Sequence, residues 1–395
     1  MARSSPEFFN LNSLDLGVLK SLRAKLISSG YDEQRIRKKL RIEHSDYLFI
    51  DPLCVPLFRH LAKGKTSLDI MISLFILETP RRMAELSTIF SRDEIRQLSR
   101  MNLIRVDLKR GLIFPKVVIY PYKGFFIMTD MAGAPDLAGC DERSVYRVGM
   151  DSFYLAEASS GLKGRSCLDI CCGSGIQSLA ASRNCESVMG IDINPRAVNF
   201  ARFNAIFNQV DNVTFICGDL YGPAKGMRFD VILANVPFVA MPGQIRRKLY
   251  GDGGKAGDEN TQKVIRGMGS HLKTGGIGLM ITEISEIEGI SSKKMMRVLV
   301  NDLKLKVLQV PAALGCSCPR CYSVSHCIPL LTTKNFEQYE QCVVRWYDNL
   351  CRNRIVKRDL ALLCIKKSKS FKLIEAKYDG SDQDISEKIK LFSYL

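Results

Sequence analysis

The chain has 395 residues, with 57 Lys and Arg against 41 Asp and Glu, a formal net charge of +16, and 46% hydrophobic residues. These proportions are those of a soluble globular protein, so collagen-like, disordered and multi-span membrane classes are excluded. The length predicts two or three compact units, each large enough to bury a core without disulfides. The positive charge permits an anionic partner without identifying one.

The N-terminal segment lacks the pattern of an export signal. Residues 1–9 contain no continuous apolar stretch, and no later segment is apolar over the length of a membrane helix. Fourteen cysteines, including the adjacent Cys171 and Cys172, suit a reducing compartment, where thiols serve as small core residues or metal ligands. The sequence therefore predicts a cytoplasmic protein with no membrane partner, and it indicates no oligomeric state.

The first part of the chain is predicted to be mainly helical, with a basic run from Arg35 to Arg41. From residue 67 onward the pattern predicts helices and then strands, over 68–77, 82–90, 93–101, 103–108, 111–120 and 124–129. Three helices followed by a strand pair is the order of a winged-helix module, so we expect a helical, winged-helix-like domain over 1–130. Such a domain binds nucleic acid, recruits substrate or is purely structural, because fold alone does not specify function.

A predicted linker over 131–145, rich in Gly, Ala and Asp, leads into a second domain over 146–395. In this domain helical patterns alternate with β-type runs, over 167–172, 187–192, 213–219, 229–235 and 276–283. Alternation of this kind implies right-handed βαβ units, and hence an α/β fold with a largely parallel sheet. Ligands of such sheets bind at the carboxyl ends of the strands.

The ends of the first three strands carry a distinctive series of residues. Asp169 is followed by two cysteines and by Gly173-Ser174-Gly175, where glycine lets the backbone approach a ligand closely. A Gly-x-Gly turn alone is weak evidence. The second strand, however, ends at Asp192 and the third at Asp219-Leu220, which places acidic side chains over the same crevice.

This series resembles the class I S-adenosylmethionine-dependent methyltransferases, most closely over about 146–285. The resemblance implies a Rossmann-like seven-stranded sheet and S-adenosyl-L-methionine as cofactor. It assigns the methionine part of the cofactor to Asp169, Gly173 and Gly175. It assigns the ribose to Asp192 and the adenine to Asp219 and Leu220. A dinucleotide-binding dehydrogenase would carry a third glycine at Ser178. Helix capping explains each acidic residue singly, but not their order along three strands.

The segment 146–156 precedes the first strand and is predicted to be a turn leading into a helix. In related methyltransferases an element at this place closes over cofactor and substrate. The resemblance therefore makes Asp151, Ser152 and Tyr154 candidate lid residues, with Ser152 and Tyr154 on the substrate side. A plain N-cap role for Asp151 or Ser152 is the structural alternative.

The fourth strand ends in Asn235-Val236-Pro237-Phe238. This resembles the Asn-Pro-Pro-Phe/Tyr signature of methyltransferases that modify planar nitrogens, such as glutamine amides in release factors and amino groups of nucleobases. The resemblance implies that the Asn235 oxygen and a main-chain carbonyl accept the two N–H bonds of the acceptor, while Phe238 stacks on its plane. It makes Asn235, Pro237 and Phe238 catalytic residues, with Asn235 also touching the cofactor and Val236 and Phe238 the substrate. Val236 departs from the signature, and an ordinary strand-ending turn is the alternative.

A cysteine cluster lies in a predicted insertion over 311–358, between a sixth strand at 304–310 and an antiparallel seventh at 360–366. The spacing of Cys316, Cys318, Cys321 and Cys327 permits a tetrahedral zinc site, and unliganded thiols are the alternative. Because the insertion leaves the sheet at its carboxyl edge, we expect it over the substrate. A helix over 336–351 is predicted to pack it down, with Trp346 as a core anchor.

The sequence thus predicts a methyltransferase that acts on a nitrogen of a protein amide, a nucleobase or a small metabolite. An O- or C-methyltransferase of secondary metabolism is the second hypothesis. A non-catalytic nucleic-acid-binding protein that retains the cofactor pocket is the third. The residues alone leave the choice among these acceptors open.

Overall fold

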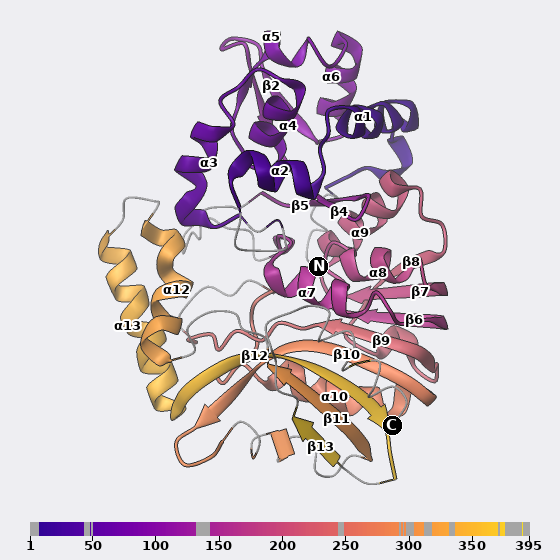
Figure 1. Cartoon of the computed structure of the whole chain (residues 1–395), viewed down its shortest axis with the longest axis vertical. Helices are drawn as coiled ribbons and strands as arrows, with labels where there is room; N and C mark the ends of the chain where they lie inside the picture. The colour runs from indigo at the N-terminus through magenta and orange to yellow at the C-terminus, as the bar shows by residue number, and fades with distance from the viewer. Residues whose placement is uncertain are drawn as a thin grey trace, which may run out of the picture.

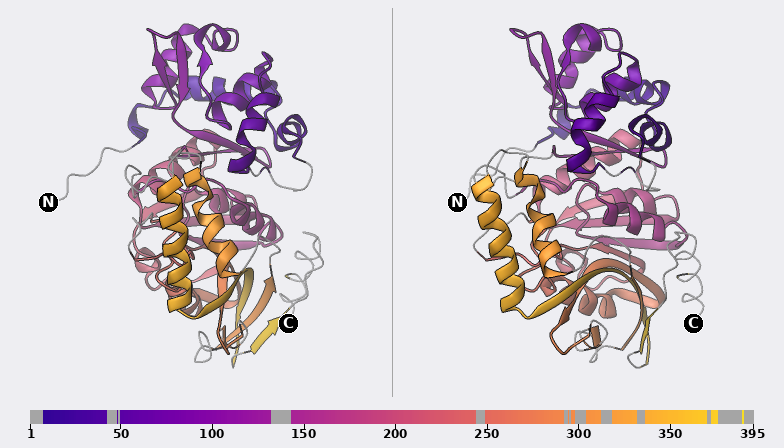
Figure 2. Two further views of the ribbon diagram at one scale, coloured as in Figure 1. Left: turned by 90° about the vertical axis from the view of Figure 1, so that its left-hand side faces the viewer. Right: turned by 60° about the vertical axis from the view of Figure 1, so that its left-hand side comes forward.

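The computed structural model has a group of short N-terminal helices at one end of a large sheet (Figure 1). Two long helices from the C-terminal third stand beside the sheet (Figure 2). The structure describes residues 8–42, 48, 50–131, 143–243, 249–291, 294, 296–297, 304–311, 318–331, 336–369, 372–375 and 389. Within these ranges, no helix has the length and the run of apolar residues needed to cross a membrane.

The N-terminal helices are η1 (Leu11–Ser13), α1 (Leu16–Ser28), α2 (Glu33–Leu40), η2 (Pro52–Cys54), α3 (Val55–Leu61), α4 (Ser67–Phe75), α5 (Met83–Leu86) and α6 (Arg92–Arg100). Several begin at a side chain that accepts an N–H of the first turn, namely Asp15, Asp32, Thr66 and Ser91. Each such cap stabilises its helix by about 1 kcal/mol, which explains where the helices start.

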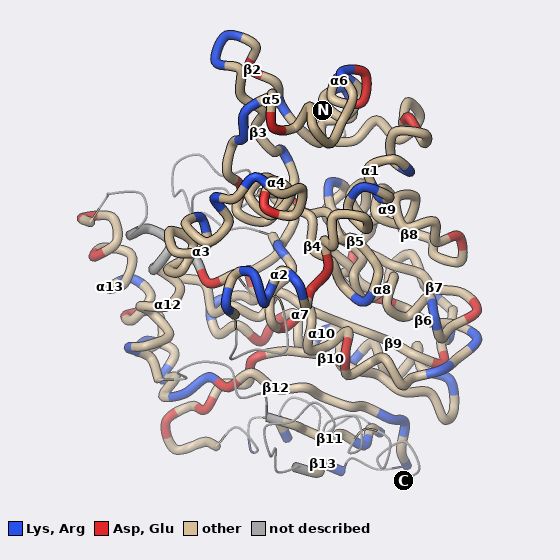
Figure 3. Tube along the Cα trace, turned by 45° about the horizontal axis from the view of Figure 1, so that its top comes forward, with Lys and Arg blue, Asp and Glu red and all other residues tan. Residues whose placement is uncertain are grey.

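The basic run predicted from the sequence lies on α2 and just beyond it (Figure 3). Ile36 and Leu40 bury the other side of this helix. Lys39 pairs with the buried Asp69 of α4 at 2.6 Å, which ties α2 to its neighbour. Of the other cations in this run, Arg35, Lys38 and Arg41 are exposed, and Arg35 pairs with Asp32 at 3.6 Å.

A small antiparallel sheet follows the helices, in the order β1-β3-β2, from β1 (Arg81–Arg82), β2 (Ile104–Asp107) and β3 (Leu112–Pro115). The single strand predicted over 111–120 is wrong. β3 ends at Pro115, and β4 (Val118–Tyr122) belongs to a separate hairpin with β5 (Phe125–Thr129). The physical reason is burial, since β3 alternates between buried and half-buried residues whereas every residue of β4 and β5 is buried.

The large sheet has eight strands among the described residues, in the order β13-β11-β12-β10-β9-β6-β7-β8. They are β6 (Gly164–Ile170), β7 (Cys185–Asp192), β8 (Val213–Cys217), β9 (Phe229–Asn235), β10 (Leu272–Ile287), β11 (Leu305–Pro311), β12 (Ile355–Lys367) and β13 (Lys372–Glu375). β12 runs antiparallel to both its neighbours, and the other pairs are parallel. The predicted α/β class and Rossmann-like sheet are confirmed, with β13 added at the edge.

Helices cover both faces of this sheet. They are α7 (Met150–Ala158), α8 (Ile176–Ala181), α9 (Pro195–Asn208) and α10 (Glu259–His271), with the short η3 (Gly222–Ala224) after β8. α10 packs through Val264 and Met268 on one face, and α7 packs through Leu155 and Ala158 on the other. Alternate residues of the strands fill these two cores, as a sheet buried on both sides requires.

The insertion between β11 and β12 contains α12 (Pro319–Leu331) and α13 (Phe336–Arg352). The predicted helix over 336–351 is therefore present. Trp346 is buried and stacks on His326, with ring centroids 4.7 Å apart, which confirms its predicted role as a core anchor.

Candidate functional site

A pocket opens at the carboxyl ends of β6, β7 and β9, where the topology predicts a ligand. Its walls come from residues 144–152, 171–177, 192–197, 235–239 and 249–251. The space between these segments is about 920 Å³, counted to the open side.

Asp192 joins the loops that follow β6 and β7. One carboxylate oxygen accepts the Gly173 N–H at 2.9 Å, and the other accepts the Asn194 N–H at 2.8 Å. Gly173 has φ 54°, a left-handed backbone conformation that favours glycine, which explains why the turn carries a glycine at this position. Burial raises the pKa of Asp192 from its usual value. Both residues line the pocket, where Asp192 offers further lone pairs to a ligand.

Asp169 lies behind the pocket rather than in its wall. It is fully buried, and one oxygen accepts the N–H of Ser178 at 3.0 Å and its hydroxyl at 2.6 Å. Burial is the main cause that raises the pKa of Asp169 to about 7. This carboxyl therefore holds the start of α8 against β6.

Gly175 serves packing in this structure. A Cβ at this position would lie 2.9 Å from the Phe215 ring and 3.1 Å from the Ala201 Cβ, so only glycine lets the loop sit against β8 and α9. Asp219 and Leu220 follow β8, and neither lines the pocket described above. The structure thus brings Gly173 and Asp192 together at the pocket but leaves the other predicted strand-end contacts outside its wall.

Asn235, the last residue of β9, points its side-chain nitrogen at the start of α7. The amide donates to Asp151 at 2.8 Å and to the Ser152 hydroxyl at 3.3 Å. The second oxygen of Asp151 accepts from the Tyr146 hydroxyl at 3.1 Å. Burial is the main cause that raises the pKa of Asp151. Asp151 and Tyr146 thereby fix which way the Asn235 amide faces.

The residues after Asn235 form the next part of the wall. Val236 is buried against the core under α10, while Pro237 and Phe238 are half-buried. The Pro237 carbonyl accepts from the Asn260 side chain at 3.3 Å, and the Phe238 carbonyl accepts from Arg358 at 2.7 Å. Their main chain is therefore held from two sides.

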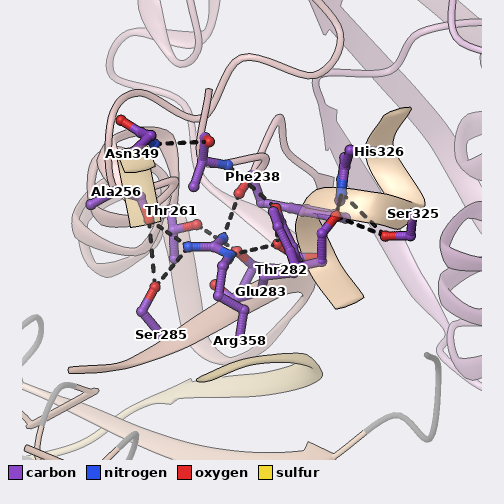
Figure 4. Close-up of polar contacts among 12 residues, drawn as sticks. Phe238, Ala256, Thr261, Thr282, Glu283, Ser285, Ser325, His326, Asn349 and Arg358 are labelled. Carbon is purple, nitrogen blue, oxygen red and sulfur yellow. Dashed lines mark hydrogen bonds and ion pairs between the residues drawn. The ribbon is translucent and has the colours of Figure 1, made fainter. Parts of the chain in front are cut away.

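Arg358 of β12 is the centre of a buried polar network behind this wall (Figure 4). It pairs with Glu283 of β10 at 2.8 Å and donates to the Ser285 hydroxyl at 2.7 Å. The Tyr322 hydroxyl of α12 donates to the same Glu283 carboxylate at 2.8 Å. The inserted helices and the antiparallel strand thus fix the segment that follows Asn235.

The pocket wall differs from the prediction at three tyrosines. Ser152 lines the pocket, whereas Tyr154 is buried between α7 and the sheet, outside the wall. Tyr146 and Tyr250 also line it, with ring centroids 5.1 Å apart. The sequence offered no signal for this pair, because the two tyrosines are about a hundred residues apart.

The predicted zinc site gains no support. Cys316 lies outside the described residues, and Cys327 is buried in contact with Cys342 of α13. Cys321 and Cys327 are six residues apart on one helix, so their side chains point in different directions. In the part of the chain that is described, no three His, Cys, Asp or Glu side chains are grouped to hold a metal ion.

Comparison with known proteins gives a consistent family. Residues 162–338 match the family model of a methyltransferase domain. A putative protein N5-glutamine methyltransferase of Methanocaldococcus jannaschii is 36% identical over 138 residues, covering 34% of this chain and 69% of that protein. A release factor glutamine methyltransferase of Thermodesulfovibrio yellowstonii is 40% identical over 78 residues, covering 19% of this chain and 28% of that protein.

Solved structures show more distant similarity. The tRNA m1G37 methyltransferase of Methanocaldococcus jannaschii is 14% identical, with a TM-score of 0.38, and the match covers 65% of this chain and 58% of that one.

Proposed function

This chain belongs to the class I S-adenosylmethionine-dependent methyltransferases, and on that premise we propose that it methylates a planar nitrogen. The orientation of Asn235 carries the proposal. Its side-chain nitrogen is engaged by Asp151, and no described residue donates to its oxygen. That oxygen is therefore the atom that would accept an N–H of the substrate.

We propose that this pocket binds the cofactor. Gly173 and its neighbours would hold the methionine part, and Asp192 would accept hydrogen bonds from the ribose hydroxyls. For Asp219 and Leu220, which follow β8 outside the described wall, we propose adenine contacts. When bound, S-adenosylmethionine supplies a methyl group on a positively charged sulfur.

The acceptor residues would act by alignment. The lone pair of an amide or aromatic amine is delocalised, so it must be aimed along the S–CH₃ bond before it can form the new N–CH₃ bond. We propose that the Asn235 oxygen and the Val236 carbonyl accept the two N–H bonds, while Phe238 packs on the plane. The acceptor nitrogen then loses one proton to solvent as S-adenosylhomocysteine leaves. No strong base is needed in this scheme.

Among nitrogen acceptors we place a glutamine side chain of a protein first. Two of the relatives described above are named as glutamine methyltransferases, which supports this order. A nucleobase amino group is the second candidate, because the exposed cations Arg35, Lys38 and Arg41 on and just beyond α2 suit a phosphate backbone.

We further propose a division into a winged-helix-like unit over 1–130, a linker over 131–145 and the methyltransferase unit over 146–395. The order α4, β1, α5, α6, β2, β3 supports the first unit, whose role would be to recruit the acceptor. We also propose a cytoplasmic location, which the free thiols of the described cysteines support.

The test incubates the full chain with methyl-labelled S-adenosylmethionine and, in turn, with the protein, RNA and small-molecule fractions of a cell extract. We expect label on glutamine in the protein fraction and none with Asn235→Ala. Label in RNA alone would show that the acceptor is a nucleobase and not a glutamine side chain. Label on oxygen or carbon would overturn the nitrogen proposal, and cofactor binding without any transfer would overturn catalysis.

A further inference from the structure

Asn204 of α9 is fully buried, and its side chain contacts both the N-terminal hairpin and the cofactor loop. Its oxygen accepts the Met128 N–H at 2.9 Å, and its nitrogen donates to the Met128 carbonyl at 2.9 Å. The second N–H of that nitrogen donates to the Ser174 carbonyl at 2.9 Å. One side chain therefore pairs with β5 as a neighbouring strand would, and holds the loop after β6 as well.

The contact at Ser174 fixes a peptide unit in the wall of the pocket. The Ser174 carbonyl and the Gly175 N–H belong to the same planar peptide. Asn204 holds the carbonyl, and the Cys172 carbonyl accepts the Gly175 N–H at 2.7 Å. Ala201, almost one turn before Asn204, packs on Gly175. The conformation of this loop thus depends on α9.

Asn208, about one turn further along α9, provides a natural comparison. It pairs with both backbone groups of Phe126 on β5, each at 2.8 Å. Its remaining N–H donates to the Asn204 carbonyl within the same helix, also at 2.8 Å. Asn208 therefore shares the hairpin contact of Asn204 but not the contact to the cofactor loop.

A second link joins the hairpin to the pocket. Asp130, directly after β5, accepts the Val145 N–H at 2.8 Å and the Arg196 Nε–H of α9 at 2.7 Å. Val145 lines the pocket. The β4–β5 hairpin is thus connected to two separate segments of the pocket wall.

From these contacts we propose that Asn204 is a positioning residue that couples docking of the β4–β5 hairpin to cofactor affinity. The proposal rests on S-adenosylmethionine binding by this family and is independent of the methyl acceptor. Because coupling between sites is reciprocal, bound cofactor stabilises the docked hairpin to the same extent as the hairpin stabilises bound cofactor.

The first test compares Asn204→Ala and Asn208→Ala in the full chain, using calorimetry with S-adenosylhomocysteine and thermal unfolding. Both variants lose hairpin contacts, so we expect a similar fall in Tm. Only Asn204→Ala is expected to bind at least tenfold more weakly, with Asn208→Ala within threefold of the wild type. An equal change in affinity for the two variants would overturn the proposal.

The second test needs no variant and covers the case in which Asn204→Ala does not fold. Hydrogen exchange of the wild-type chain is measured with and without S-adenosylhomocysteine. Exchange over residues 125–129 is expected to slow at least threefold, while residues 104–107, in the other small sheet, stay unchanged. No slowing at 125–129 would overturn the coupling. Failure of the wild type to bind the ligand at all would instead count against the proposed function.

Discussion

Asn235 and Asp151 are 84 residues apart in sequence, yet the amide of one donates to the carboxylate of the other at 2.8 Å. The contact joins the end of β9 to the first turn of α7. An amide has a donor end and an acceptor end, so a carboxylate that takes the donor end determines what the other end offers. Which atom the Asn235 amide offers to a ligand thus depends on a residue outside the strand-end motif.

The variant Asn235→Ala should keep its affinity for S-adenosylhomocysteine and lose about a hundredfold in turnover, on the order of 2.7 kcal/mol. In the proposed function the Asn235 oxygen aligns the acceptor, whereas the proposed cofactor contacts of Gly173 and Asp192 come from the loops after β6 and β7. The matched contrast is Asp192→Ala, which should weaken cofactor binding at least tenfold. Calorimetry and single-turnover methyl transfer measure the two effects. Wild-type turnover by Asn235→Ala would refute the assignment.

The variant Asp151→Asn tests the orientation of Asn235. An asparagine at 151 offers both a donor and an acceptor, so the Asn235 amide is no longer held one way round. We expect turnover to fall about tenfold with S-adenosylhomocysteine affinity unchanged. Ser152→Ala, which removes only the 3.3 Å contact, is the control and should lose less than threefold. Equal losses for both variants would show that Asp151 does not orient the amide.

The largely parallel sheet and the approximate positions of its strand ends were predictable, because alternating βαβ patterns leave few topologies. The side of the sheet that each strand-end residue faces was not. Asp169 and Asp192 both sit at the end of a strand, but one faces α8 and the other faces the pocket. Tyr154 follows Ser152 by two helical residues, or about 200°, so it lies on the opposite side of α7.

Contacts between distant segments were beyond the reach of the sequence. Nothing in the pattern of Asn204 and Asn208 distinguishes side chains that pair with a strand from ordinary helix surface residues. The single strand predicted over 111–120 failed for the same reason, since β3 pairs with β1 and β2 whereas β4 pairs with β5 in a separate hairpin.

The buried Asp169 should make stability fall as the pH rises. Its pKa is raised to about 7 in the folded chain, above the ordinary value of about 3.9 for an unfolded chain. Between these two pKa values the folded state binds more protons than the unfolded state. This group therefore lowers the free energy of unfolding by up to about 1.4 kcal/mol for each unit that the pH rises. Asp169→Asn stays neutral and should unfold with less dependence on pH from 4 to 7. Urea unfolding at several pH values measures this, and identical slopes for variant and wild type would contradict it.

The Arg358–Glu283 pair should be strongly coupled in stability. The Arg358 side chain is 1% exposed and that of Glu283 14%, so removal of one partner leaves a buried charge without its counterion. Arg358→Met should lower the free energy of unfolding by about 3–5 kcal/mol, and Glu283→Gln should lower it as well. The double variant Arg358→Met/Glu283→Gln should recover part of the summed loss, because no uncompensated charge remains. Urea unfolding of all four proteins gives the coupling energy. Strictly additive losses would mean that the two side chains contribute to stability independently, and that the segment after Asn235 is held by the other contacts of Arg358 rather than by the ion pair.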